Sequence, residues 1–412
     1  MKSKFKIIFT FIFATIIFLN LIPNSFAASV SVNAESAIIT EVSTGRIIYE
    51  KNSTAKMYPA STTKVMTAIL TIENTSPQDI VTVSASALSN IPEGYVTCGL
   101  VTGEELTVND LLHALMLPSA NDAAYVLAEH IGGSVDGFSD LMNRKARELG
   151  CMNTHFVNPN GIHDNNHYST AYDLYLIANY AMKNETFRNL VATKEYTLPA
   201  TNIYPNNDRV LVTTNDLLKE SSKNYYKYAI GIKTGYTSKA GDCLISEASR
   251  DGLEFISVVL NGDRFEDTKK LYNYAYDNYT LTKLTEAGSI LDTIEIEKAT
   301  KETKTLDVAI DKSITVIINK DIDLNSVIPE ITYNENLEAP IPANTVIGTI
   351  KYKVDDIEYS ANLLAKQDVI KQNYSIYIFI TGISLLLVAT IMMKLSKPKK
   401  YTKKRISKWN PF

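Results

Sequence analysis

The segment Ser61-Thr-Thr-Lys64 places a hydroxyl and an amine three residues apart, at the start of an apolar stretch. Residues with this spacing share one face of a helix, with about 5–6 Å between their Cβ atoms, so the Lys64 amine can reach the Ser61 hydroxyl. An amine can take the proton of a serine only while it is neutral, which requires burial or a nearby positive charge. The pair is therefore a candidate nucleophile and base, although a serine at a helix start is often only a cap.

Two further segments follow along the chain, and all three lie close enough in sequence to belong to one domain. Ser119-Ala-Asn121 lies in the connection between two predicted helices, and Lys233-Thr-Gly235 ends a predicted strand. By itself, the first of these fits an ordinary loop in which Ser119 and Asn121 cap helices. Gly235 would let a ligand or another backbone come close to the strand. Together the three segments favour a catalytic site.

The surrounding pattern predicts an α+β domain in which helices flank an antiparallel sheet. Alternating residues on both sides of the turn at 43–45 indicate a hairpin, and Pro59 leads into a helix that is apolar almost all round. Caps and apolar periodicity predict the other elements. The predicted helices cover about 61–70, 107–117, 122–131, 137–150, the residues after Ser169, and 266–279, and the predicted strands cover 36–42, 46–49, 229–237, 242–248 and 255–260.

The composition changes at about Leu284, after which apolar and polar residues alternate between Pro and Asn turns. This pattern, clearest at 313–318 and 349–354, predicts a small all-β domain. It contains no set of residues with evident chemistry. We therefore expect a catalytic domain at 28–282 and an all-β domain at 283–368.

Both ends of the chain carry hydrophobic segments. Three early lysines, an apolar run and a small-x-small site ending at Ala27 predict a secretory signal peptide at 1–27, with an uncleaved anchor as the alternative. Residues 374–393 are twenty uncharged residues, enough for a transmembrane helix. The tail at 394–412 carries eight Lys and Arg residues and no acid. The positive-inside rule then predicts a cytoplasmic tail, a single-pass C-terminal anchor in the cell membrane and an extracytoplasmic catalytic domain.

The exported part of the chain is acidic. Without the cations of the signal peptide and the tail, about 30 basic residues face 45 acidic ones, and a surface of this charge does not bind nucleic acid. The three cysteines, at 98, 151 and 243, fit packed thiols, with one disulfide as the alternative. His163 and His167 flank Asp164 and raise the question of zinc, but the segment is not helical, so the spacing does not bring both rings together. We expect loop histidines and no metal.

With all three segments in place, the chain resembles the penicillin-recognising serine enzymes. More narrowly, it is similar to the low-molecular-mass penicillin-binding proteins of the serine-type D-alanyl-D-alanine carboxypeptidase family. The similarity covers about residues 30–280, and the all-β domain and the C-terminal anchor fit the same family's layout. The flanking residues that support it are Tyr58-Pro-Ala before Ser61, Leu117-Pro before Ser119, Asn158 to Gly161, His167 to Asp173, and Gly231 to Thr237.

The resemblance implies an activity centred on Ser61. Such an enzyme removes the terminal D-alanine from the pentapeptide stem of peptidoglycan through an acyl-enzyme, and β-lactam antibiotics inhibit it by forming a stable ester. Lys64 would be the base, Ser119 would relay a proton, and Asn121 would hold the substrate and Lys64. The family needs no metal or organic cofactor.

The resemblance also implies how the substrate is held. Lys233 would help to keep the first lysine neutral and would attract the substrate's terminal carboxylate, which the Thr234 hydroxyl would bind beside Gly235. The backbone N–H groups of Ser61 and Tyr236 would form the oxyanion hole.

Two positions depart from the family pattern. Ala120 stands where many relatives have glycine or aspartate. Thr214-Asn215 stands where some relatives have an arginine before the asparagine, so carboxylate recognition would rest more on Lys233 and Thr234.

Two alternatives to the carboxypeptidase remain at this point. A β-lactamase on the same fold would, in one large class, carry a Glu-x-x-Leu-Asn segment, which the sequence lacks between Asn121 and Lys233. A non-catalytic wall-binding or sensory protein would have no chemical need for two lysines around one serine.

Overall fold

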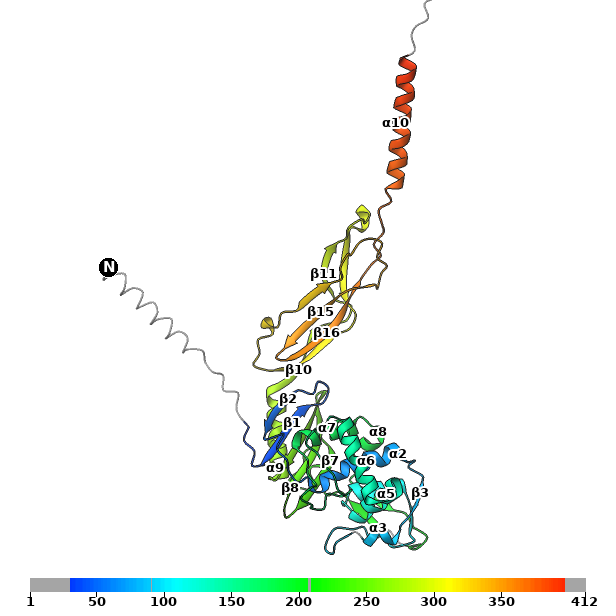
Figure 1. The fold of residues 1–412 in the computed structure, drawn as a ribbon. Helices are drawn as coiled ribbons and strands as arrows, with labels where there is room; N and C mark the ends of the chain where they lie inside the picture. Colours follow the sequence, from blue (N-terminus) through cyan, green and yellow to red (C-terminus); the bar gives the residue numbers. More distant parts are fainter. Residues whose placement is uncertain (1–29, 90, 207–208, 397–412) are drawn as a thin grey trace, which may run out of the picture. The chain divides into compact units, whose positions relative to one another are not determined.

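The computed structural model describes residues 30–89, 91–206 and 209–396 (Figure 1). These residues form two compact units. The first holds the described residues up to Thr280 together with Asn319–Asp321, and the second holds the rest. The predicted signal peptide and most of the predicted basic tail lie outside the described residues.

An antiparallel sheet forms the centre of the first unit. Among the described residues it has five strands, in the order β2 (Ile47–Lys51), β1 (Ser36–Glu41), β9 (Leu253–Leu260), β8 (Gly241–Arg250) and β7 (Ala229–Thr237). The first hairpin of the chain therefore lies beside strands from its far end. Strand β1 and nearly all of β9 are buried, because helices cover both faces of the sheet. The predicted antiparallel sheet flanked by helices is confirmed.

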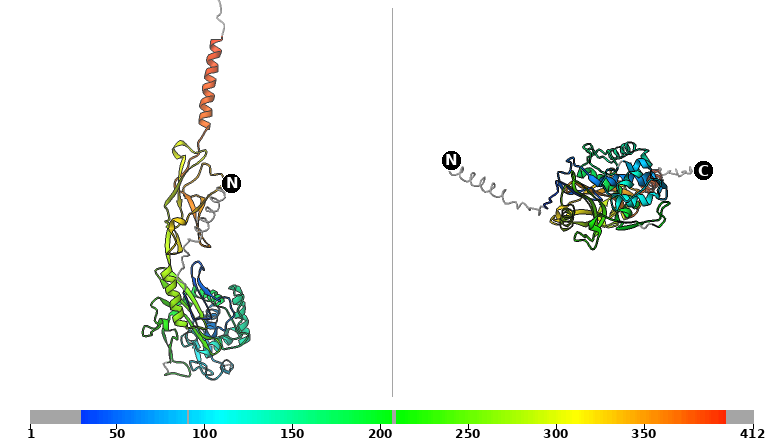
Figure 2. Two further views of the ribbon diagram at one scale, coloured as in Figure 1. Left: turned by 90° about the vertical axis from the view of Figure 1, so that its left-hand side faces the viewer. Right: turned by 90° about the horizontal axis from the view of Figure 1, so that it is seen from below.

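Helices lie on the two faces of this sheet (Figures 1 and 2). Helix α9 (Arg264–Asn278) packs on β8 and β9 from one side, and the other helices gather on the opposite side. That group comprises α2 (Lys64–Asn74), α3 (Ala85–Ser89), α4 (Val108–Met116), α5 (Asn121–Gly132), α6 (Val135–Glu148), α7 (Ala171–Met182) and α8 (Glu185–Ala192).

Helix α2 runs through the middle of the helical layer. Every residue from Lys64 to Thr71 is buried, and α4, α5, α6, α7 and α8 all contact this helix. A helix that is apolar almost all round is typical of such a position. The Lys64 amine is consequently enclosed by protein at the first residue of the helix.

The connection between α4 and α5 carries the second of the three segments. Helix α4 begins with a capping box, in which Thr107 Oγ1 accepts from the Asp110 N–H and the Asp110 carboxylate accepts from the Thr107 N–H, both at 3.1 Å. Only four residues separate the two helices. Ser119 within them has φ +68°, and the Ala120 N–H donates to the Ala114 carbonyl at 3.0 Å.

Several helix starts differ from the predictions by one to three residues. The helix predicted from residue 61 begins with a 3₁₀ turn, η1 (Ala60–Thr63), before α2. The helix predicted after Gly137 begins at Val135, because the Ser134 side chain caps it by accepting from the Gly137 N–H at 3.0 Å. Shorter elements of this unit are β3 (Ile80–Thr82), β4 (Glu105–Thr107), β5 (Glu195–Leu198), β6 (Arg209–Val212) and η2 (Asp216–Leu218).

The second unit is an all-β structure followed by one helix. Its main sheet has the order β11 (Ile290–Glu295), β12 (Thr305–Ile310), β16 (Ile357–Ala365), β15 (Val346–Val354) and β14 (Glu330–Tyr333), and β10 (Tyr279–Thr285) pairs with β13 (Ile314–Asn319). The 3₁₀ turns η3 (Lys301–Thr303) and η4 (Leu324–Ser326) lie between strands. Its buried residues, among them Val308, Val316 and Leu363, form a separate core, so the predicted all-β fold is confirmed.

Helix α10 (Ser375–Leu395) overlaps the predicted transmembrane segment at 374–393. Within the described part of the chain, it is the one helix that is long and apolar enough to cross a membrane. Its large apolar side chains are exposed.

Candidate active site

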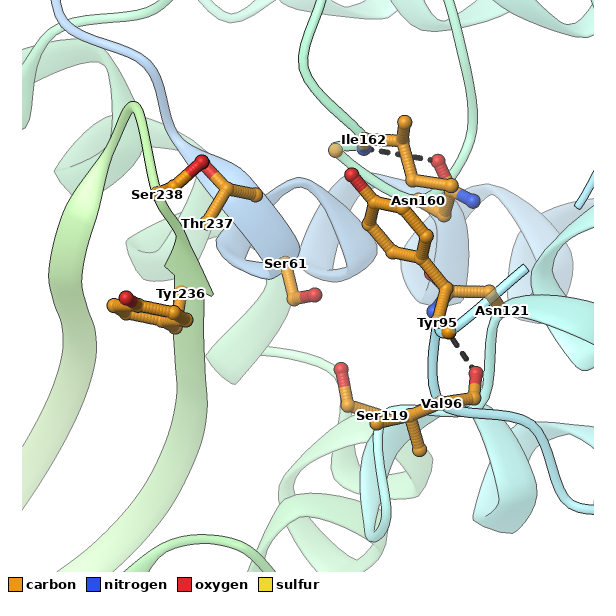
Figure 3. A pocket seen from close by; sticks show the side chains of 12 residues that line it. Ser61, Tyr95, Val96, Ser119, Asn121, Asn160, Ile162, Tyr236, Thr237 and Ser238 are labelled. Carbon is orange, nitrogen blue, oxygen red and sulfur yellow. Dashed lines mark hydrogen bonds between the residues drawn. The ribbon is translucent and has the colours of Figure 1, made fainter. Parts of the chain in front are cut away.

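Ser61 lies in the turn η1 beside a cavity of about 290 Å³ (Figure 3). The preceding residue, Ala60, has φ +49°, a conformation that costs a residue other than glycine about 1–3 kcal/mol. Packing around the turn must therefore hold Ser61 in place. The cavity is lined by Ser61, Gly94, Tyr95, Val96, Ser119, Asn121, Asn160, Gly161, Ile162, Tyr236, Thr237 and Ser238.

The Lys64 side chain is fully buried, and its amine has three neighbours. Nζ lies 3.1 Å from Ser61 Oγ, 2.9 Å from Asn121 Oδ1 and 3.0 Å from the backbone oxygen of Asn160. Burial and then the charge of Lys233 hold the pKa of Lys64 well below its ordinary value, against an opposing effect of Asp122.

The neighbours of the neutral amine determine where its lone pair points. A neutral amine keeps two N–H groups, and the oxygens of Asn121 and Asn160 can only accept hydrogen bonds. If these two oxygens take both N–H groups, the lone pair faces Ser61, whose O–H can then donate to Nζ. The arrangement therefore favours the orientation in which Lys64 can take the proton of Ser61.

Ser119 approaches the cavity from the connection before α5, and Asn121 approaches it as the first residue of that helix. The Asn121 Nδ2 group donates to the Val96 carbonyl at 2.9 Å, which leaves Oδ1 for Lys64. The Ser119 hydroxyl is buried and has no hydrogen-bond partner among the described residues. Figure 3 shows Ser119 and Ser61 on facing sides of the cavity. An unpaired buried hydroxyl is costly, and a ligand group placed between these serines would satisfy it.

Strand β7 carries a second buried lysine. Lys233 Nζ donates to the Thr234 backbone oxygen at 3.0 Å, and burial followed by the charge of Arg264 lowers the pKa of Lys233 to about 7. Arg264 in turn donates to the Gly235 carbonyl at 2.9 Å and pairs with Asp242 at 3.0 Å. Arg264 is not among the predicted site residues, because no motif marks the first residue of the closing helix.

The end of β7 runs directly against the turn that holds Ser61. A Cβ atom at Gly235 would lie 3.1 Å from the Pro59 oxygen and from the Ser61 and Thr62 nitrogens. Glycine therefore permits this close approach, which brings the backbone of Tyr236 next to that of Ser61. Beside it, the Thr234 and Thr214 hydroxyl oxygens are 2.6 Å apart.

A loop outside the predicted catalytic residues supports Lys64. Asn158 Oδ1 accepts from the Gly161 N–H at 2.8 Å, and this turn directs the Asn160 carbonyl to the lysine. Gly161 has φ +80°, and a Cβ there would lie 1.7 Å from the Ala60 oxygen. The Asn-Pro-Asn-Gly sequence indicates a turn, but it does not reveal what the carbonyl contacts.

His167 packs behind the turn as a neutral ring. The Val157 N–H donates to Nδ1 at 3.2 Å, so Nε2 carries the proton and donates to Thr63 Oγ1 at 2.8 Å. Burial lowers the pKa of His167 to about 3. The rings of His163 and Tyr58 pack edge to face, with 4.5 Å between their centroids. Within the described ranges, no group of three or more His, Cys, Asp or Glu residues could hold a metal ion.

The structure brings the predicted site residues together. Four of them line the cavity, namely Ser61, Ser119, Asn121 and Tyr236. The other predicted residues, Lys64, Lys233, Thr234 and Gly235, are buried. The three cysteines are free thiols, and Cys98 lies 3.5 Å from the Asp122 carboxylate.

Two family models match the chain. The model described as D-alanyl-D-alanine carboxypeptidase matches residues 24–264, and the model described as penicillin-binding protein 5, C-terminal domain, matches residues 279–371. Together they match most of each compact unit.

Known proteins and structures are similar along most of the chain. It is 33% identical over 353 residues to the D-alanyl-D-alanine carboxypeptidase DacF of Bacillus subtilis, covering 83% of this chain and 87% of the relative. It is 30% identical to DacA of Haemophilus influenzae, covering 82% and 86%. The crystal structure of penicillin-binding protein 5 from Haemophilus influenzae matches with a TM-score of 0.63 at 28% identity, covering 83% of this chain and 98% of that one.

If benzylpenicillin acylates Ser61, the charge of Lys233 should give the rate of this reaction an alkaline limb. Because the pKa of Lys233 is about 7, the second-order rate should fall as the pH rises through this value and the attraction for the ligand's carboxylate is lost. Replacing Arg264→Gln removes a charge that lowers this pKa, so the fall should move to higher pH. Arg250→Gln, which changes an arginine packed on Tyr228 and Tyr276, is the control. Equal alkaline limbs in all three proteins would contradict this assignment.

Proposed function

The chain belongs to the D-alanyl-D-alanine carboxypeptidase family of serine peptidases, and on this premise we propose that Ser61 is the nucleophile with which it removes the terminal D-alanine from the peptidoglycan pentapeptide stem. The observation that carries the proposal is the buried Lys64 amine, 3.1 Å from Ser61 Oγ and with a lowered pKa. A β-lactam resembles the D-Ala-D-Ala end and acylates the same oxygen.

The first half of the reaction forms an acyl-enzyme. Neutral Lys64 takes the proton of Ser61 as Oγ bonds to the carbonyl carbon of the penultimate D-alanine. Negative charge develops on the carbonyl oxygen, and the N–H groups of Ser61 and Tyr236 stabilise it. The close approach at Gly235 supports this pairing of two backbone donors.

The proton must then reach the leaving amine. Ser119, whose hydroxyl lies unpaired at the cavity, passes it from the lysine to the nitrogen as the C–N bond breaks and D-alanine departs. In the second half, Lys64 takes a proton from water, the water oxygen attacks the ester carbon, and the C–Oγ bond breaks. Lys64 returns the proton to Ser61, and the shortened peptide leaves as a carboxylate after losing the remaining proton of the water to solvent.

Carboxylate recognition explains the selectivity for a chain end. The terminal carboxylate binds beside Lys233, which is cationic below a pH of about 7, and accepts from the Thr234 hydroxyl. Thr214 contacts that hydroxyl, and Arg264 adds positive charge behind the strand. An internal peptide bond presents no such carboxylate and loses this attraction.

We further propose that α10 anchors the enzyme in the cell membrane with the catalytic unit outside. The helix has 21 residues, about 30 Å at 1.5 Å per residue, which matches a bilayer core. The basic residues that follow it support a cytoplasmic end. The predicted signal peptide at 1–27 supplies the export that this orientation requires.

Mass spectrometry with benzylpenicillin tests the nucleophile. The full-length protein should gain the mass of one penicillin on the Ser61 peptide and release D-alanine from a synthetic peptide ending in D-Ala-D-Ala. Ser61→Ala should abolish the adduct and lower the release by about 10⁴-fold or more. Ser89→Ala removes an exposed hydroxyl on α3 that does not line this cavity and should keep both activities.

Two outcomes of this experiment would contradict the proposed carboxypeptidase and indicate another function. Hydrolysed penicillin without an adduct would indicate a β-lactamase, and intact penicillin without an adduct or D-alanine release would indicate a non-catalytic binding protein.

Fractionation of expressing cells tests the anchor. Full-length protein should sediment with membranes, whereas a chain ending at residue 373 should be released because the apolar helix is gone. Protease added to intact protoplasts should digest the catalytic unit, whereas a tag fused after residue 412 should be protected. A tag that is digested while the catalytic unit survives would reverse the orientation, and full-length protein in the soluble fraction would remove the anchor.

A further inference from the structure

Residues 94–100, here called the strap, begin with the part of the cavity wall that lies opposite β7. The strap contains no helix or strand, yet it contributes Gly94, Tyr95 and Val96 to the cavity lining. Tyr95 and Val96 are 38% and 54% exposed, and Figure 3 shows both at the cavity. An irregular segment with exposed apolar side chains needs other groups to hold its shape.

The strap contacts the catalytic machinery through one carbonyl. The Val96 oxygen accepts from the backbone N–H and from the side-chain Nδ2 of Asn121, both at 2.9 Å, and Figure 3 marks a hydrogen bond between these residues. Turning the amide over would place its oxygen against the Val96 oxygen and its NH₂ group against the Lys64 amine. Val96 therefore sets the orientation in which Asn121 Oδ1 holds Lys64.

The Asp122 carboxylate holds the strap from the side of α5. Both its oxygens lie 3.1 Å from the Cys98 nitrogen, Oδ2 accepts from the Leu100 N–H at 3.0 Å, and the Cys98 thiol lies 3.5 Å from Oδ1. Oδ1 also accepts from the Ala123 N–H at 3.0 Å. Asp122 is 1% exposed, so these contacts are shielded from water and replace its hydration.

Arg209 holds the strap from the other side. Its guanidinium donates to the Cys98 and Gly99 carbonyls at 3.4 and 3.5 Å and pairs with the buried Glu104. The backbone N–H groups at the end of the strap thus donate to the Asp122 carboxylate, and its backbone carbonyls accept from the Arg209 guanidinium. This arrangement fixes residues 98–100 without any regular secondary structure.

We propose that Asp122 is a positioning residue for the reaction at Ser61, acting through the strap on Asn121 and Lys64. The inference rests on the proposed function of Ser61. Two properties of Asp122 are needed: two acceptor oxygens that bind the Cys98 and Leu100 N–H groups, and a negative charge near Lys64. An asparagine has the same shape but one acceptor oxygen and no charge, so it would leave a strap donor facing another donor.

The negative charge of Asp122 has a second effect, on the pKa of Lys64, that can be measured independently of the strap. Two charged groups act on the buried Lys64 amine, Lys233 from β7 and Asp122 from α5, and they shift its pKa in opposite directions. Removing the negative charge lowers the pKa of Lys64, so the amine stays neutral to lower pH. The acidic limb of Ser61 acylation then moves to lower pH even as the maximal rate falls.

The test compares Asp122→Asn with Asp110→Asn in the full-length protein. Asp110 is also buried and accepts from Thr107 and Tyr196, but it caps α4 and does not contact the strap. Rates of acylation by benzylpenicillin are measured against pH, with thermal unfolding to establish that each variant is folded. Asp122→Asn should lower the maximal rate by about 10- to 100-fold, as expected for a misplaced catalytic group, and shift the acidic limb down. Asp110→Asn should leave the pH profile unchanged.

If Asp122→Asn does not fold, alanine substitutions at two glycines can test the role of the strap instead. Gly99 in the strap and Gly150 after α6 have φ +77° and +83°, and a Cβ would meet no atom within 4 Å at either. Alanine strains both backbones similarly, but only Gly99→Ala disturbs the strap. It should slow acylation without moving the acidic limb, and Gly150→Ala should do neither.

Three results separate the possible failures. A folded Asp122→Asn protein with the wild-type rate and acidic limb would overturn the proposal. Equal rates for Gly99→Ala and Gly150→Ala would overturn it where Asp122→Asn is unfolded. If the wild-type protein itself forms no adduct with penicillin on Ser61, the proposed function fails, and with it the premise of the inference.

Discussion

The Lys64 amine lies inside the protein with three hydrogen-bond neighbours and a lowered pKa. Two of these neighbours are oxygens from different parts of the chain, the Asn121 side chain and the Asn160 backbone, and the third is Ser61. A charged amine would lose its hydration here, so the site favours the neutral form. The chemistry of the serine depends on this constraint, because only a neutral amine can take its proton.

The fold meets this constraint by bringing backbones unusually close together. Gly235 lets β7 run against the turn of Ser61, and Gly161 lets the Asn160 loop do so from the other side. Helix α2 contributes the lysine from the middle of the helical layer. The turn keeps Ala60 and the connection before α5 keeps Ser119 at positive φ, so the surrounding core must stabilise two strained residues on either side of the nucleophile.

Much of this arrangement follows from the sequence, and the remainder has a physical reason for being invisible there. Helix spacing predicts the contact between Ser61 and Lys64, and apolar patterning predicts the sheet and the buried α2. A backbone carbonyl such as that of Asn160 leaves no mark in residue types. Arg264 acts from a helix that begins about thirty residues after Lys233, and Asp122 has the type and position of an ordinary helix-start acid. Their partners become evident only when the chain is folded.

Titration of Lys64 itself shows directly whether its amine is neutral in the folded protein. The Cε resonance of ¹³C-labelled lysine can be followed by NMR against pH, with Lys64→Arg to assign it. We expect Lys64 to lose its proton well below the ordinary lysine value of 10.5, because of burial and the charge of Lys233, and we expect Lys233→Met to raise this pKa. An ordinary pKa in both proteins would mean that Lys64 remains charged and is not the base for Ser61.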